Sequence, residues 1–177
     1  MKAVPLAALA ATAIAIALSL SACDDRPAAG AGSGSDACGE IQRPPVQGGE
    51  HLIGDREPPV EYSSVPPTSG WHSSGALQIA VRGEDDPLTE PEQVSVLEAG
   101  GVVAAHRDLD AQQRRELEAL AAGEYSGRLA VTPYDRLEAG QVALTAWGVL
   151  QLCDAVDVEA IRAFADAHAG QATEAGH

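Results

Sequence analysis

Lysine and asparagine are nearly missing from this sequence. Asparagine does not occur at all, which excludes N-linked glycosylation. Lys2 is the only lysine, so the other ten of the 11 basic residues are arginines. Against these stand 26 acidic residues, which gives a formal net charge of −15. Because phosphate contacts need arginine and lysine, a chain this acidic is expected to bind no nucleic acid.

Catalytic signatures are missing as well. The sequence contains no GxSxG, HExxH or GxGxxG motif, no P-loop and no EF-hand loop. It also lacks a CxxC motif and a cluster of cysteine and histidine, so neither a redox centre nor a structural zinc site is indicated. A hydrolase triad built from Ser69 or Ser73 with His72 has no nucleophile elbow to support it. We therefore expect a protein that is not an enzyme.

The amino terminus carries the clearest motif. Residues 3–20 are almost wholly apolar and follow the single charge of Lys2. The Leu-Ser-Ala-Cys sequence that ends at Cys23 then resembles a bacterial lipobox. In that class the signal peptide, here residues 1–22, is removed and the cysteine thiol receives acyl chains that anchor the protein. We predict a lipoprotein on the extracytoplasmic face of the cell membrane; an uncleaved membrane helix and a secretory signal cut elsewhere are the alternatives.

The cysteine count agrees with that location. Lipidation of Cys23 leaves Cys38 and Cys153 as an even pair in an oxidising compartment. A disulfide between them closes a loop of about 115 residues and stabilises the fold by roughly 4–5 kcal/mol. The alternative is two independent buried thiols.

Composition divides the remaining chain into a tether, one domain and a tail. Residues 23–47 begin with Gly-Ser-rich sequence that is typical of a flexible tether. Residues 48–170 form one domain of ordinary size, although proline and glycine remain frequent up to residue 70 and predict turns there. Residues 171–177 are predicted to be a frayed tail.

Hydrophobic patterning predicts the elements of this domain. Two short helices, each with an aspartate N-cap, are expected at 111–122 and at about 158–169. β-rich segments are 76–81, 94–97, 102–106, 128–132 and 141–152, the last of them bent or bulged at a glycine. The predicted fold is therefore a small single α+β domain, with one mostly antiparallel sheet and two short helices packed on one face.

Two of the five histidines, His51 and His72, lie in the proline-rich part of the chain. Functional groups are often carried on loops that a scaffold holds in place, and neutral imidazole is a common metal ligand. His168 is better explained as a structural residue near the end of a helix. His106 is expected at a turn or on the surface, where it is a possible further ligand.

Four segments of the chain resemble a single family. They are Pro66–His72, Val94–Val103, Val131–Tyr134 and Ala143–Gly148. Together they are similar to the uncharacterised bacterial family called domain of unknown function 3105, over roughly residues 48–170. Members of that family are typically extracytoplasmic, often membrane-anchored, and have no agreed activity.

The resemblance also bears on the histidines. The family typically has histidine at the positions of His51 and His72, and two further histidines where this chain has Ser95 and Ala99. Together with Glu98, such residue types would suit copper or zinc. Neither serine nor alanine replaces an imidazole, and the loss of two of four nitrogen ligands is expected to abolish tight binding. Either this member has lost the site or the histidines were never ligands; a reduced histidine site that still binds copper or zinc is the alternative.

Two hypotheses follow for the function. The first is a lipid-anchored, non-enzymatic domain without a cofactor, which binds an unknown protein of the cell envelope. The second is a lipoprotein that binds copper or zinc through His51, His72 and Glu98. Imidazoles more than about 8 Å apart would exclude a shared ion, because Zn–N bonds are roughly 2 Å long.

Overall fold

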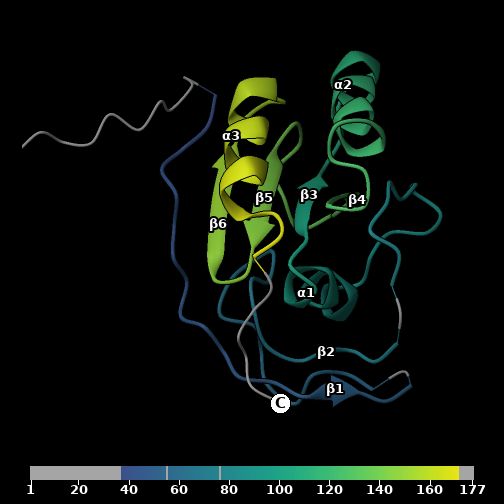
Figure 1. Cartoon of the computed structure of the whole chain (residues 1–177), viewed down its shortest axis with the longest axis vertical. Helices are drawn as coiled ribbons and strands as arrows, with labels where there is room; N and C mark the ends of the chain where they lie inside the picture. Colours follow the sequence, from purple (N-terminus) through teal and green to yellow (C-terminus); the bar gives the residue numbers. More distant parts are fainter. Residues whose placement is uncertain (1–36, 55, 76, 172–177) are drawn as a thin grey trace, which may run out of the picture. The chain divides into compact units, whose positions relative to one another are not determined.

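The computed structural model describes residues 37–54, 56–75 and 77–171 (Figure 1). The predicted signal peptide, the predicted lipidation site Cys23 and residues 172–177 of the predicted tail lie outside the described residues. Among the residues that are described, no helix is long and apolar enough to cross a membrane.

The centre of the described chain is a four-stranded mixed sheet with the strand order β4-β3-β5-β6 (Figure 1). The strands are β3 (Val102–His106), β4 (Leu129–Pro133), β5 (Val142–Ala146) and β6 (Val149–Cys153). β3 runs parallel to β4 and antiparallel to β5, and β5 runs antiparallel to β6. All five residues of β3 are buried, as expected for a central strand that is covered on both faces.

Helices cover both faces of this sheet. α2 (Ala111–Ala122) and α3 (Val158–His168) pack on one face, where their leucine, isoleucine and phenylalanine side chains meet Val102 and Ala104. α1 (Glu90–Glu98) packs on the other face, against Val103 and Ala105. Because successive side chains of β3 point to opposite faces of the sheet, the domain has two separate apolar cores, one on each face.

Extended segments lie along both edge strands of the sheet, β6 and β4, and pair with them. On one side, Gly39 donates to the Leu152 carbonyl and Gln42 exchanges two backbone hydrogen bonds with Leu150 of β6. A disulfide joins Cys38 to Cys153 at the start of this segment. On the other side, the Arg82 N–H donates to the Val131 carbonyl of β4. The sequence assigned residues 37–47 to the tether, but residues 38–42 are paired with the sheet.

A second, much smaller sheet consists of two strands of two residues each, β1 (His51–Leu52) and β2 (His72–Ser73). They pair in parallel, with His51 opposite His72. Figure 1 shows this ribbon beside α1, and its β2 strand contacts that helix. Side-chain hydrogen bonds hold the chain between the two strands, among them the bond from Tyr62 Oη to the Trp71 carbonyl at 2.6 Å.

The α+β class is confirmed, but three details of the predicted fold are wrong. Residues 94–97 belong to a third helix, α1, because Thr89 and Glu92 form a capping box that starts the helix before this apolar run. Val81 makes only an isolated bridge to Val131 where a strand was expected. The run 141–152 is a tight hairpin, whose turn places Gly148 at φ 68°. Helices α2 and α3 do share one face, as predicted.

Candidate functional site

The ribbon of β1 and β2 brings two distant histidines together. His51 and His72 are directly paired in the ladder, so their side chains leave the same face. Their ring centroids are 4.4 Å apart in an edge-on arrangement with an interplanar angle of 68°. This spacing lies well inside the limit of about 8 Å for a shared ion.

Close backbone approach is what positions the first histidine. The chain just before β1 runs so near the second segment that a Cβ on Gly49 would lie 2.3 Å from the carbonyl carbon of Gly70 and from the nitrogen of Trp71. Only glycine fits such a contact between two backbones. Gly49 therefore allows residues 50–52 to align with residues 71–73.

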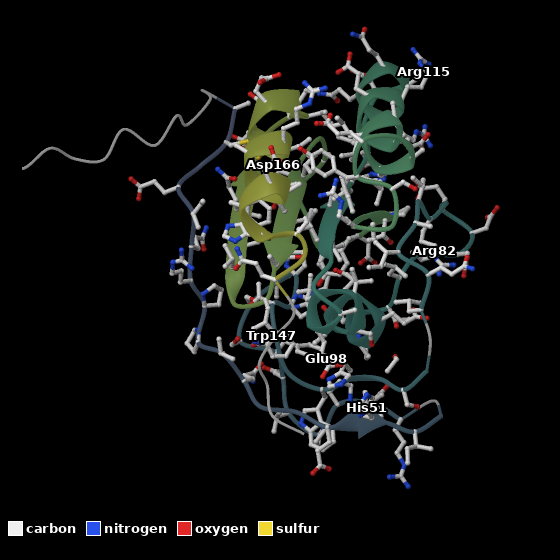
Figure 2. The ribbon with its side chains drawn as sticks, viewed as in Figure 1. His51, Arg82, Glu98, Arg115, Trp147 and Asp166 are labelled. Carbon is white, nitrogen blue, oxygen red and sulfur yellow. A yellow bond between two sulfur atoms is a disulfide. The ribbon has the colours of Figure 1, made fainter. Side chains whose placement is uncertain are left out.

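The last turn of α1 supplies the third side chain. Glu98 Oε2 lies 2.8 Å from His72 Nε2. One helical turn earlier, the Ser95 hydroxyl donates to the Ser73 carbonyl at 3.0 Å, which fixes α1 against β2. Figure 2 shows Glu98 reaching from α1 and His51 from the ribbon below it.

These three residues form a group with the geometry of a metal site. One ligand atom from each of His51, His72 and Glu98 lies within 4.8 Å of the other two. Zinc ligands lie about 2.0–2.2 Å from the ion, so three donors around one ion are at most about 4.4 Å apart, which is close to the spacing of this group. Within the described part of the chain, no other histidine, cysteine or acidic residue joins them.

The hydrogen bonds of His72 define which nitrogen is available. Its Nδ1 lies 3.0 Å from the Gly70 carbonyl oxygen. A carbonyl only accepts, which assigns the ring hydrogen to Nδ1 and leaves Nε2 toward Glu98. A ligand histidine commonly donates its other N–H to a backbone carbonyl in this way.

The contact between His72 and Glu98 calls for a positive charge. Although Nε2 and Oε2 are 2.8 Å apart, they lack the alignment of a hydrogen bond. A neutral ring would direct its lone pair at a carboxylate, which is repulsive. Either a proton on Nε2, giving an ion pair, or a metal ion removes that repulsion.

Exposure is uneven across the group. The side chain of His72 is 4% exposed, that of Glu98 is 23% exposed, and His51 is exposed. The group is therefore closed on the side of His72 and accessible from the side of His51.

Two other histidines of the described residues, His106 and His168, do not join the group. His106 ends β3 and is only 3% exposed, so the expectation of a turn or surface residue is wrong. Burial lowers its pKa, an effect that Glu84 and Glu118 oppose and that Arg114 reinforces. His168 packs against Phe164 with ring centroids 4.7 Å apart, consistent with a structural role.

One contributor was missed at the level of sequence. The Gly70 carbonyl orients His72, but a backbone group leaves no mark of its own in a sequence. The only available signal was the glycine two residues before the histidine in the Pro66–His72 segment.

The fold and this group define a small α+β domain that carries a two-histidine, one-carboxylate cluster. The family described as "Protein of unknown function (DUF3105)" matches residues 55–177, and the chain belongs to this family. The match includes His72 and Glu98 but begins four residues after His51, whereas the sequence resemblance was expected to begin near residue 48. No curated protein and no solved structure matches the chain.

Proposed function

We propose that this protein binds a divalent transition-metal ion, Zn(II) or Cu(II), through His51, His72 and Glu98. The observation that carries the proposal is the convergence of these three donors, from three separate segments, within 4.8 Å of one another. A random grouping of surface acids would not include a buried histidine whose second nitrogen is already held by a carbonyl.

The donor set indicates which metals the site prefers. Two imidazoles and one carboxylate suit Zn(II) and Cu(II), whereas Cu(I) prefers the softer thiolate and thioether ligands. Mg(II) and Ca(II) prefer oxygen ligands alone. The expected order of affinity therefore places Cu(II) and Zn(II) above Cu(I), with Mg(II) and Ca(II) weakest.

The binding experiment uses the purified chain and elemental analysis followed by titration with Zn(II), Cu(II) and Cu(I). One ion per chain, lost in both His51→Ala and His72→Ala, supports the proposal. His168→Ala is the matched control, because it removes a histidine that lies outside the group. Equal binding by all four proteins, or no binding by the wild-type chain, would contradict it.

The lipid anchor at Cys23 belongs to the same proposal and places the metal site outside the cytoplasm. It is supported by the lipobox-like sequence that ends at Cys23. In detergent-phase partitioning, the wild-type chain made in bacteria should enter the detergent phase and Cys23→Ala should not. If the variant partitions like the wild type, the lipid anchor is refuted, whereas the proposal of a metal site is unaffected.

A second candidate function is the binding of an envelope protein without catalysis. It is favoured by a groove with a volume of about 1040 Å³ between residues 56–65 and the start of α1. Val60 lines this groove and is 55% exposed. A photo-crosslinker at Val60, compared with one at the exposed Arg115 of α2, tests it. A specific adduct from position 60 alone supports this function, and identical adducts from both positions count against it.

A further inference from the structure

We infer that a metal ion held by His51, His72 and Glu98 keeps a fourth coordination position open, and that this position accepts the imidazole of another protein molecule. The inference rests on the proposed function. Zn(II) is almost always four-coordinate in proteins, and three protein ligands leave one position for an external ligand. Among the histidine, cysteine and acidic side chains of the described residues, only these three come together.

The Ser95 hydroxyl is hydrogen-bonded to two backbone carbonyls. Ser95 lies one helical turn before Glu98, so it shares the helix face that meets β2. Its single hydroxyl hydrogen is shared between the carbonyls of Ser73 and Pro91, each of which lies 3.0 Å from Oγ. The Ser95 hydroxyl therefore holds the helix against the ribbon.

The residue after Glu98 offers no donor either. Ala99 is exposed and caps the helix with φ −69° and ψ 2°, a conformation open to any residue. It lies four residues after Ser95 and so continues the same face of α1. The methyl group of Ala99 contributes no donor to coordination.

Access to the open position is from the solvent side. His72 is buried and its ring is fixed through Nδ1, whereas His51 is exposed and Glu98 is partly exposed. An external ligand therefore approaches past His51 and Glu98. A side chain that projects from the surface of a second protein can reach such a site, which suits the transfer of an ion between proteins.

Charge favours a neutral nitrogen donor over an anion. The chain carries a formal charge of −15, and Glu98 already supplies one negative ligand. A field of this sign lowers the local concentration of thiolates, carboxylates and phosphates. Imidazole is neutral near pH 7 and suits both Zn(II) and Cu(II). The complementary group is therefore a histidine side chain on the surface of a partner that gives or takes the metal.

The test loads the full chain with one equivalent of Co(II), whose visible spectrum reports coordination, and then adds imidazole. We expect a saturable spectral shift with one imidazole per Co(II). The key variant is Ala99→His, which places a fourth imidazole on the same helix face. It should bind Co(II) more tightly than wild type and lose the response to added imidazole. His168→Ala, which removes a histidine outside the group, should keep the response.

The outcomes separate this inference from the proposed function. If the chain binds no Co(II), the metal site itself is refuted. If Co(II) binds stoichiometrically and the spectrum ignores imidazole, the site is closed and the inference fails while the metal site stands. A shift with azide but none with imidazole would also overturn it, because the open position would then select anions.

Discussion

Two histidines of this protein are equally buried but differ in the groups that face their rings. His72 and His106 are each 3% exposed. His106 ends a central strand, and its Nδ1 has no hydrogen-bond partner within the described chain. His72 lies in a two-residue strand, with one nitrogen held by the Gly70 carbonyl and the other 2.8 Å from a carboxylate. The comparison teaches that the groups facing the ring, and not its burial, mark a candidate ligand.

The same contrast separates the two regions that carry these residues. The four-stranded sheet has two apolar cores, three ladders and a disulfide. The proline-rich segment has a two-residue ladder and a few side-chain bonds, such as Gln47 Nε2 to the Glu61 carbonyl at 2.8 Å. Most of the stabilising contacts lie in the four-stranded sheet. The two candidate metal-binding histidines lie in the segment that has the fewest such contacts.

The largest expected effect concerns the sheet alone. Replacing Cys38 and Cys153 together by alanine removes the bridge that holds residues 37–42 along β6. The chain-entropy estimate for a loop of about 115 residues is a loss of roughly 4–5 kcal/mol in the free energy of unfolding. Urea unfolding measures this loss. Metal affinity of the folded fraction should stay at the wild-type value, and its disappearance would show that the two regions are not separable.

The next effect concerns the proline-rich segment alone. Free Zn(II) at 100 times its Kd stabilises the bound state by about 2.7 kcal/mol, which corresponds to about 100-fold slower exchange of amides whose opening breaks the site. Hydrogen exchange should therefore slow between residues 56 and 73 and stay unchanged in β3–β6. His72→Ala should show no response to zinc. Equal slowing in both regions would mean that they open together.

A smaller effect tests the carboxylate. Glu98→Gln keeps an oxygen but removes the charge, and we expect Zn(II) affinity to fall about 10–100-fold, by analogy with the loss of a ligand's supporting partner. Glu118→Gln is the matched control. It removes the same charge from α2, which packs on the opposite face of the sheet from α1. If titration gives the two variants the same Zn(II) affinity, Glu98 is not a ligand of the ion.

The smallest expected effect concerns His106. Burial lowers its pKa, so the unfolded chain binds more protons in acid than the folded chain does. Its contribution to stability is complete above the ordinary pKa of about 6.5 and is lost as the pH falls below it. His106→Gln should flatten the pH dependence of the unfolding free energy in metal-free buffer. A slope identical to that of wild type would contradict this.

The sequence allowed the parts with strong local signals to be predicted. Aspartate caps and clear stop signals gave helix α2 at residues 111–122, and cysteine parity gave the pair Cys38 and Cys153. The run 94–97 was misassigned because a short apolar segment fits a strand and a buried helix equally. His51, His72 and Glu98 could be named as candidates, but their meeting depends on parallel pairing and on the close approach at Gly49, which are tertiary contacts.

The most direct test of the metal site is anomalous X-ray scattering at the zinc edge from crystals of the zinc-loaded chain. The account predicts one peak per chain, about 2.0–2.1 Å from His72 Nε2 and at a similar distance from His51 and Glu98. Direct contact between His72 and Glu98 without an anomalous peak between them would contradict the account. An anomalous peak at another histidine would also contradict it.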